Sequence, residues 1–282
     1  MLRICSDSTC DLSEEIIQKY GITIIPLHIV LDDKEYRDRV EITSEEIFEW
    51  ADKNKTTPKT SAASVVDVEA AIKPMLDAGD ELVIFTISEL MSTTANVIRM
   101  VAEDLDVIDR VHVVSSDNLS TGIGLLVVEA ALMAQNGLDA TQILDEVKRL
   151  KPKVRSSFVI DTLTYLARGG RCSSVAALAG GILRIHPKII VKDGKMEVSK
   201  KYRGQMHAVV MDYVKDMHHA LLGARPQRVF ITHTCRDHLI VDKVRAYLEE
   251  LGYFDEIIET SAGGVISSHC GPGTLGVLFI EG

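Results

Sequence analysis

The chain has 282 residues, of which 46% are hydrophobic and 26% are charged, a composition typical of one large globular domain or two smaller ones. Its 41 acidic residues outnumber the 31 basic ones and give a formal net charge of −10, which argues against nucleic acid as a partner. The opening residues MLRICSDSTC lack an apolar signal segment, and no stretch supplies about 20 apolar residues, so we expect neither a signal peptide nor a membrane span.

The five cysteines favour a reducing compartment. Their number is odd, their spacings are wide and no C-x-x-C motif occurs, so we expect reduced thiols in the cytoplasm and no disulfide framework or zinc site. The nine histidines do not change this expectation, because His233 and His238 are five residues apart and do not show the usual spacing of metal ligands.

The first half of the chain alternates strand and helix patterns. A short strand, Leu2–Cys5, precedes a helix that Ser13 caps and Gly21 ends, and a strand is expected over Ile22–Leu31. Thr43 and Glu46 form a capping box for a helix through Asp52, and Ser64 caps another over Val65–Asp77. Leu82–Ile87 and Val111–Val114 are apolar runs suited to buried parallel strands, each followed by polar residues and a helix. This order predicts βαβ units and a parallel sheet.

The pattern changes after about residue 155. Phe158–Ile160 leads to a helix that ends at Gly169-Gly170, and Ile189–Val191 and Met196–Val198 flank an Asp-Gly turn that predicts a β-hairpin. One long helix is expected over Gln205–Leu222 and another over Ile240–Leu251. Further strands are predicted at Val229–Thr232, Ile257–Glu259 and Leu275–Ile280. We therefore predict an α/β fold of two closely packed domains: a parallel-sheet domain over residues 1–153 and an α+β domain over residues 154–282.

Hydroxyl side chains gather at predicted strand ends and helix starts. The four clusters are Ser6-Asp7-Ser8-Thr9, Thr60-Ser61-Ala62-Ala63-Ser64, Ser88 through Ser92-Thr93-Thr94, and Ser115-Ser116-Asp117. Each can be explained as helix capping, but together they contain more hydroxyls than capping requires. Because helix starts and strand ends favour anions, the excess indicates a carboxylate or phosphate site.

A glycine-rich segment near residue 270 contains His269. Gly271, Gly273 and Gly276 match G-x-G-x-x-G, but the context is wrong for a dinucleotide site because a final strand follows and no helix does. We interpret Gly271-Pro272-Gly273 as a tight turn that fixes His269. A histidine held in this way can donate to an anion, act as a base, or only satisfy backbone groups.

Positive charge gathers between Arg168 and Arg203, where nine Lys or Arg accompany only two acids. The segment is either a solvated face or a surface for an anion. Arg168-Gly169-Gly170-Arg171 favours the second interpretation, because the glycines let a phosphate or a partner's carboxylate approach the guanidinium groups.

Enzyme motifs are missing: there is no G-x-S-x-G, Walker A, H-E-x-x-H or N-terminal Rossmann motif. Cys270 next to His269 is a poor candidate for a nucleophile pair, because such pairs meet in space rather than in sequence. Hydroxyls, one histidine and many aliphatic residues favour binding of an apolar acid over catalysis.

Six motifs in order resemble the DegV family of bacterial fatty-acid-binding proteins over nearly the whole chain. They are Asp7-Ser8-Thr9-Cys10-Asp11-Leu12-Ser13, Lys59-Thr60-Ser61-x-x-Ser64, Leu90-Met91-Ser92-x-Thr94 after Ile87-Ser88, Ser116-Asp117-x-x-Ser120-x-Gly122, Thr162-Leu163-x-Tyr165-Leu166-x-Arg168-Gly169-Gly170-Arg171, and His269-x-Gly271-Pro272-Gly273-Thr274-Leu275-Gly276. Two motifs depart from the family pattern: Thr93 replaces a usual glycine, and Ala62-Ala63 replace Gln-Pro.

The resemblance implies a two-domain α/β fold with a long-chain fatty acid buried between the domains and no other cofactor. It assigns the carboxylate to Thr60 or Ser61, to Ser92 with Thr93 and Thr94 close by, and to His269. It also implies that the chain is a cytoplasmic carrier that presents the carboxylate to a separate kinase for acyl-phosphate formation. Arg168, Arg171 and Arg203 are the candidate docking residues, and transient membrane contact would serve ligand exchange.

Two other functions stay open. One is a small-molecule hydrolase or transferase that uses Ser92 or Cys270 with His269. The other is a protein-interaction module in which the fatty acid is only structural.

Overall fold

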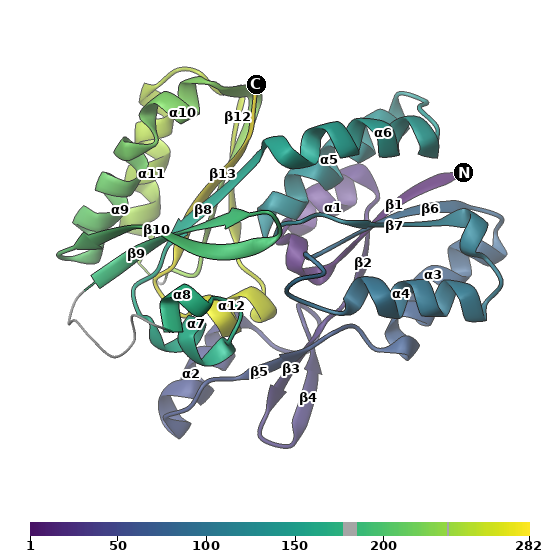
Figure 1. Cartoon of the computed structure of the whole chain (residues 1–282), viewed down its shortest axis with the longest axis horizontal. Coiled ribbons are helices and arrows are strands. Elements are labelled where there is room, and N and C mark those ends of the chain that lie inside the picture. Colours follow the sequence, from purple (N-terminus) through teal and green to yellow (C-terminus); the bar gives the residue numbers. More distant parts are fainter. Residues whose placement is uncertain (177–184, 236) are drawn as a thin grey trace.

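A computed structural model describes residues 1–176, 185–235 and 237–282. Three sheets organise these residues: a four-stranded parallel sheet, a six-stranded mixed sheet and a small three-stranded sheet. Figure 1 shows the mixed sheet and the parallel sheet side by side, with the small sheet below them. The predicted α/β fold class is confirmed. None of the described helices is long and apolar enough to cross a membrane.

The parallel sheet has the order β2-β1-β6-β7 and is formed by the first 115 residues. Its strands are β1 (Leu2–Asp7), β2 (Thr23–Ile25), β6 (Glu81–Thr86) and β7 (Val111–Ser115). Its helices are α1 (Glu14–Tyr20), α3 (Val65–Asp77), α4 (Thr94–Asp104), α5 (Thr121–Gln135) and α6 (Ala140–Leu150). Alternate residues of β6 face opposite sides: Leu82 and Ile84 pack with α3 and α4, whereas Val83 and Phe85 pack with α5. Helices therefore cover both faces, as the apolar runs predicted.

The mixed sheet has the order β10-β9-β8-β13-β11-β12 and is formed entirely after residue 153. Its strands are β8 (Val154–Val159), β9 (Ile185–Lys192), β10 (Lys195–Arg203), β11 (Ala224–His233), β12 (Glu256–Ser261) and β13 (Leu275–Glu281). One face of this sheet is covered by three helices: α9 (Met206–Asp216), α10 (His218–Leu222) and α11 (His238–Glu250). Helix α5 covers the other face and thus lies between the two large sheets. This division of the strands supports the domain boundary that we propose after residue 153.

The small sheet has the order β4-β3-β5 and carries one wall of the candidate site. Its strands are β3 (His28–Leu31), β4 (Lys34–Arg37) and β5 (Lys59–Ser61), and the helices near it are α2 (Ser44–Asn54), α7 (Thr164–Gly169), α8 (Ser173–Ala176) and α12 (Gly264–Cys270). Helix α12 comes late in the chain, yet it packs on α2, β3 and β5 from the first half. Short 3-10 turns complete the fold: η1 (Ser8–Cys10), η2 (Ile108–Arg110) and η3 (Lys151–Lys153).

Local signals in the sequence predicted several element ends correctly. Ser13 caps α1 and Gly21 ends it in the left-handed conformation, with φ of 64°. The Thr43–Glu46 capping box is present at the start of α2, and Ser64 caps α3. The hairpin between β9 and β10 turns at Asp193 and Gly194, both of which have positive φ.

Two predicted elements were wrong. Ile22–Leu31 is not one strand, because the chain leaves the parallel sheet at Pro26, which has no N–H to donate, and β3 joins the small sheet. Gln205–Leu222 is not one helix. The backbone N–H of Met217 donates to the carbonyl of Val214 at 3.1 Å, which is three residues back in the sequence instead of the four of an α-helix, and Met217 adopts ψ of 2°. That turn separates α9 from α10.

Candidate functional site

A cavity of about 450 Å³ brings together most of the predicted site residues. Its polar lining comes from Thr60, Ser61, Glu89, Ser92, Thr93, Arg171 and His269, and the Glu89 carboxylate is paired with Arg99 at 2.6 Å. Its apolar walls include Ile87, Met91, Leu119, Met196 and Ile266. Because β5, the loop after β6, the segment after α7, and α12 all reach this cavity, which we call the head-group cavity, it depends on elements from both halves of the chain.

His269 is held by its helix and by a close backbone neighbour. It lies in the last turn of α12, which ends at Gly271, and the positive φ values of Gly271 and Gly273 form the predicted tight turn. A Cβ atom at Gly169 would lie only 2.3 Å from Nδ1 of His269, so only glycine fits beside the ring. The Gly-Gly pair that we associated with anion approach therefore also positions the histidine.

His269 forms a hydrogen bond with Thr60 that joins two distant segments. Nε2 of His269 and Oγ1 of Thr60 are 2.7 Å apart, although 209 residues separate them in sequence. Nδ1 is buried and has no hydrogen-bond partner among the described residues. A proton on Nδ1 would lack an acceptor, so the tautomer with the proton on Nε2 is favoured. His269 then donates to Thr60, and the Thr60 hydroxyl keeps its own proton for a ligand.

The charge state of His269 follows from its surroundings. Burial, reinforced by the nearby positive charge of Arg171, lowers the pKa of His269 to about 4. The ring is therefore neutral at physiological pH. It can orient a hydroxyl donor, but it does not bring a full positive charge to the cavity.

Ser92 and Thr94 form a hydroxyl pair at the start of α4. Their side-chain oxygens are 2.9 Å apart, and the Thr94 backbone N–H also bonds to Oγ of Ser92. Ser92 and Thr93 border the cavity, whereas Thr94 is fully buried behind Ser92 and is not part of the lining. The geometry thus makes Ser92 a candidate ligand contact and Thr94 its positioning partner.

Ser61 borders the cavity, but its hydroxyl is directed elsewhere. Successive side chains of a strand point to opposite faces. Oγ of Ser61 therefore donates to Glu35 at 2.9 Å, whereas the neighbouring Thr60 forms a hydrogen bond with His269. Thr60 is accordingly the stronger of the two candidates that the sequence left open.

The first and fourth hydroxyl clusters serve the fold rather than this cavity. Oγ of Ser8 donates to Asp38 at 2.7 Å, and the Asp7 carboxylate accepts from Thr9 and from the Ile87 backbone. Ser116 bonds within its own turn, to Asn118. Only two of the four clusters therefore border the head-group cavity.

Two aspartates that the sequence did not single out as site residues fix α12. Asp11 accepts the Gly263 N–H at 2.8 Å, and Asp38 accepts the Gly264 N–H at 2.7 Å. Carboxylates at a helix start satisfy free N–H groups and oppose the helix dipole. These long-range bonds hold the start of the helix whose end carries His269.

The three predicted docking arginines occupy different positions. All three are exposed. Arg171 borders the cavity and donates to the Gly169 carbonyl at 2.8 Å, whereas Arg168 and Arg203 are not part of its lining. Residues 177–184 of the basic segment lie outside the described residues.

The described contacts do not form the nucleophile–histidine pair that the alternative hydrolase or transferase would need. His269 pairs with Thr60, and Ser92 pairs with Thr94. Burial raises the pKa of the Cys270 thiol to about 12, which keeps it protonated and poorly nucleophilic.

His233 and His238 lie closer together than their sequence spacing suggested. With Glu259 they place potential ligand atoms within 4.8 Å of one another. However, Nδ1 of His233 accepts the Cys235 N–H, so its proton is on Nε2, facing Glu259 at 3.3 Å. Arg245 also holds Glu259, at 3.0 Å. This arrangement is a satisfied hydrogen-bond network, and we propose no metal there.

The DegV family model, described as "Uncharacterised protein, DegV family", matches residues 1–282. The chain belongs to the DegV family. A DegV domain-containing protein of Caldanaerobacter subterraneus subsp. tengcongensis is 32% identical to it over 282 residues, which is 99% of each chain.

Two solved structures resemble this DegV-family chain. One concerns fatty-acid binding of a DegV family protein from Thermus thermophilus, with 28% identity, a TM-score of 0.91 and 99% of each chain covered. The other is a stearic-acid-binding protein from Eubacterium ventriosum, with 28% identity, a TM-score of 0.86, and coverage of 100% of this chain and 98% of that one.

Proposed function

We propose that this protein binds a long-chain fatty acid, with its carboxylate in the head-group cavity and without catalysing a reaction. The Thr60–His269 hydrogen bond is the observation that carries the proposal, because it orients a hydroxyl donor into a cavity with apolar walls. The two similar solved structures, one described by the fatty-acid binding of a DegV family protein and the other as a stearic-acid-binding protein, support the same ligand class.

The head group needs donors because a carboxylate buried without partners would cost several kcal/mol or more. Thr60 and Ser92 offer hydroxyl donors, each positioned by a second polar side chain: His269 for Thr60 and Thr94 for Ser92. Arg171 is exposed at the border of the same cavity and enters no described ion pair, so it remains available to a partner at the cavity mouth. The arrangement suits a monoanion that remains near the protein surface.

The acyl chain is proposed to run from this cavity toward the mixed sheet. A narrow cavity of about 20 Å³ shares Leu119, Ile266 and Cys270 with the head-group cavity and reaches Phe158 and Leu278. A chain of about 15 methylenes would gain roughly 12 kcal/mol from burial before ordering costs. The narrow part must widen to admit such a chain.

Replacing the hydroxyl donors tests the head-group assignment. We expect Ser92→Ala and Thr60→Val each to weaken fatty-acid binding about ten- to hundred-fold, because each removes a hydrogen bond to a charged group worth roughly 1.5–3 kcal/mol. Displacement of a fluorescent fatty acid measures the effect.

Ser61→Ala is the matched control, since its hydroxyl bonds to Glu35, and it should bind normally. Unchanged affinity in both Ser92→Ala and Thr60→Val would overturn the assignment. Extraction of the purified protein followed by mass spectrometry identifies the bound acid.

The protein is further proposed to present the carboxylate to a separate kinase in the bacterial cytoplasm, through a surface that includes Arg168, Arg171 and Arg203. Support comes from Arg171, which is exposed and borders the head-group cavity, and from the exposed side chains of the other two. The cysteines Cys5, Cys10, Cys172 and Cys270 are buried free thiols, which suits a reducing compartment.

A further inference from the structure

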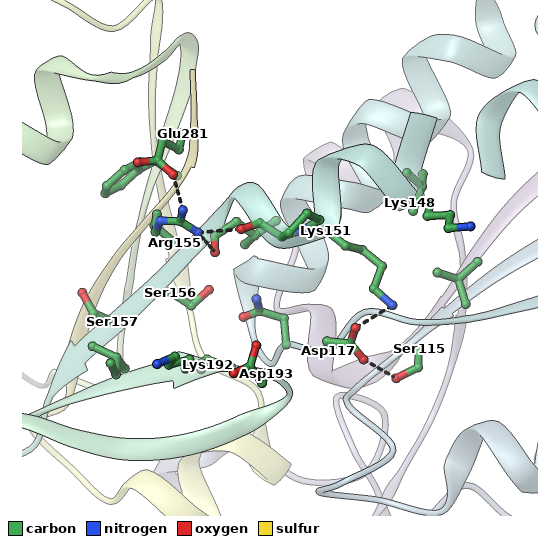
Figure 2. A pocket seen from close by; sticks show the side chains of 18 of the residues that line it. Ser115, Asp117, Lys148, Lys151, Arg155, Ser156, Ser157, Lys192, Asp193 and Glu281 are labelled. Atoms are coloured by element: carbon green, nitrogen blue, oxygen red, sulfur yellow. Dashed lines mark hydrogen bonds and ion pairs between the residues drawn. The ribbon is translucent and has the colours of Figure 1, made fainter. Parts of the chain in front are cut away.

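A second and larger cavity, of about 1040 Å³, lies between the two halves of the chain. We call it the interdomain cleft. It is bounded by β7, α6, β8, β9 and β13. The β9–β10 hairpin lies between it and the head-group cavity, although Glu89 borders both: Lys192 and Asp193 line the cleft, whereas Met196 lines the head-group cavity. Figure 2 shows the cleft, with Lys148 and Lys151 on one side and Arg155, Lys192 and Asp193 on the other.

The cleft arises where two paired strands separate. The ladder between β8 and β9 ends at the Ser157–Ile190 pair, although β8 begins three residues earlier, at Val154, and β9 continues to Lys192. The hairpin end is instead held by Ser88, whose hydroxyl donates to the Gly194 carbonyl at 2.7 Å. Because the hairpin is fixed on the loop after β6, the gap between β8 and β9 is part of the fold.

Aliphatic residues form part of the cleft walls, beside a larger number of polar and charged residues. The aliphatic residues include Val113, Val114, Leu144, Val147, Ile190 and Val191. Phe279 is the one aromatic residue among the described lining residues, and it is only 2% exposed. Such walls suit an alkyl chain, whereas a nucleobase is usually held by stacking on an accessible aromatic ring.

Charged side chains of both signs line the cleft, and the positive ones prevail. Six are basic and four are acidic, which gives a net charge of +2. Three basic residues are neutralised by ion pairs: Arg99 by Glu89 at 2.6 Å, Lys151 by Asp117 at 2.7 Å, and Arg155 by Glu281. Lys148, Lys188 and Lys192 have no described ion pair, and Asp193 is the one lining carboxylate without one.

Two groups in the cleft could gain a partner from a ligand: the half-buried ammonium of Lys188, which lies over the Tyr213 ring at 5.3 Å and has no described ion pair, and the hydroxyl of Ser156. Burial lowers the pKa of Lys188, with Asp216 nearby acting in the opposite direction, so an anion close to Lys188 would restore favourable solvation of its charge. The hydroxyl of Ser156, a residue that is 3% exposed, is buried without a hydrogen-bond partner in the described part of the chain.

We propose that the interdomain cleft binds a phosphate monoester with an alkyl body. A phosphate monoester carries about −1.5 to −2 charges at pH 7, which matches the net charge of the lining, whereas a carboxylate carries only one. The three lysines without a described ion pair and the Ser156 hydroxyl supply donors, and the aliphatic part of the walls covers the chain. A cleft of this volume is at the upper end of the usual range for small-molecule sites.

The test uses decyl phosphate as the probe and the whole protein preloaded with stearate, so that the head-group cavity is occupied. Calorimetry measures decyl phosphate binding, and extraction confirms that stearate is retained. We expect binding that weakens about fourfold for each methylene removed from the probe, the factor that corresponds to about 0.8 kcal/mol per buried methylene. Adenosine monophosphate and inorganic phosphate should bind much more weakly than decyl phosphate.

Two variants of the same hairpin provide the decisive comparison. Lys192→Glu should weaken decyl phosphate binding at least tenfold, whereas Lys195→Glu, the same charge change outside the lining, should alter it less than twofold. Equal effects of the two variants, or no binding of decyl phosphate, would overturn the proposal. If adenosine monophosphate bound as tightly as decyl phosphate, the proposal that the ligand has an alkyl body would be overturned. If stearate is not retained, the Lys192→Glu and Lys195→Glu variants are compared in the same way on stearate-free protein, with the same outcomes supporting or overturning the proposal.

Discussion

At the scale of single residues, the head-group cavity depends on a glycine as much as on its polar side chains. Gly169 has a backbone conformation that other residues can adopt, so only space restricts this position. We predict that Gly169→Ala weakens fatty-acid binding about tenfold or more, because its Cβ atom would displace the His269 ring from Thr60. Fluorescent fatty-acid displacement measures this loss.

The neighbouring glycine provides the control. Gly170 has φ of 68° and open space around its Cβ position, so Gly170→Ala should cost about 1–2 kcal/mol of folding stability and leave binding unchanged. Normal binding by Gly169→Ala would show that the ring position is not set by this contact.

At the scale of elements, α12 is held at its start by Asp11 and Asp38, and this attachment should depend on pH. Burial raises the pKa of Asp11 to about 7, against the lowering effects of the Ser120 and Gly263 hydrogen bonds. In the unfolded chain an aspartate titrates near 3.9. Between these values the folded state binds the extra proton, so the Asp11 contribution to stability is present at low pH and is lost as pH rises through about 7.

We therefore predict that the melting temperature of the wild type, relative to Asp11→Asn, falls as pH rises from about 4 to 8. Asparagine fits this position, since its amide can accept from Gly263 and donate to Ser120, and it tolerates the φ of 52°. The lowered pKa of His269 has the opposite effect, because it makes the folded state more stable as pH rises from 4 to 6.5. His269 is present in both proteins, so its effect cancels when the melting temperature of the variant is subtracted from that of the wild type. Calorimetry across this range would contradict the prediction if the two curves run parallel.

Elements defined by nearby residues were predictable from the sequence, and those defined by distant contacts were not. The caps at Ser13, Thr43 and Ser64 depend on side chains within three residues of the backbone they satisfy. The small sheet pairs His28 with Ser61, which lies 33 residues later, and no local sequence pattern predicts that pairing. Similarly, the sequence named His269 and Thr60 as candidates, but only the fold shows that they meet and that Thr94 lies behind Ser92.

At the scale of the whole molecule, an acidic chain presents Arg171 at the border of the head-group cavity. We predict that Arg171→Ala and Arg203→Ala retain near-normal fatty-acid affinity but slow acyl-phosphate formation by a cognate kinase, much as raised salt would. Charges at the rim of an interface act mainly on the association rate, and salt screens them. The paired assays are fatty-acid binding alone and phosphorylation with the kinase.

A parallel fall of binding and phosphorylation would assign these arginines to the ligand site instead. No change in either assay would make the basic segment a solvated surface. Lys201→Ala is a suitable control, because it removes an exposed positive charge from the same strand as Arg203.

The separation of Thr60 and His269 along the chain also has a consequence during translation. A ribosome that adds about 5–20 residues per second makes His269 roughly 10–40 s after Thr60, which lies 209 residues earlier. Once Ser115 has been added, the nascent protein has all the strands of its parallel sheet but still only one side of the head-group pair. On the proposed function, the site for a fatty acid is therefore complete only when nearly all of the protein has been synthesised.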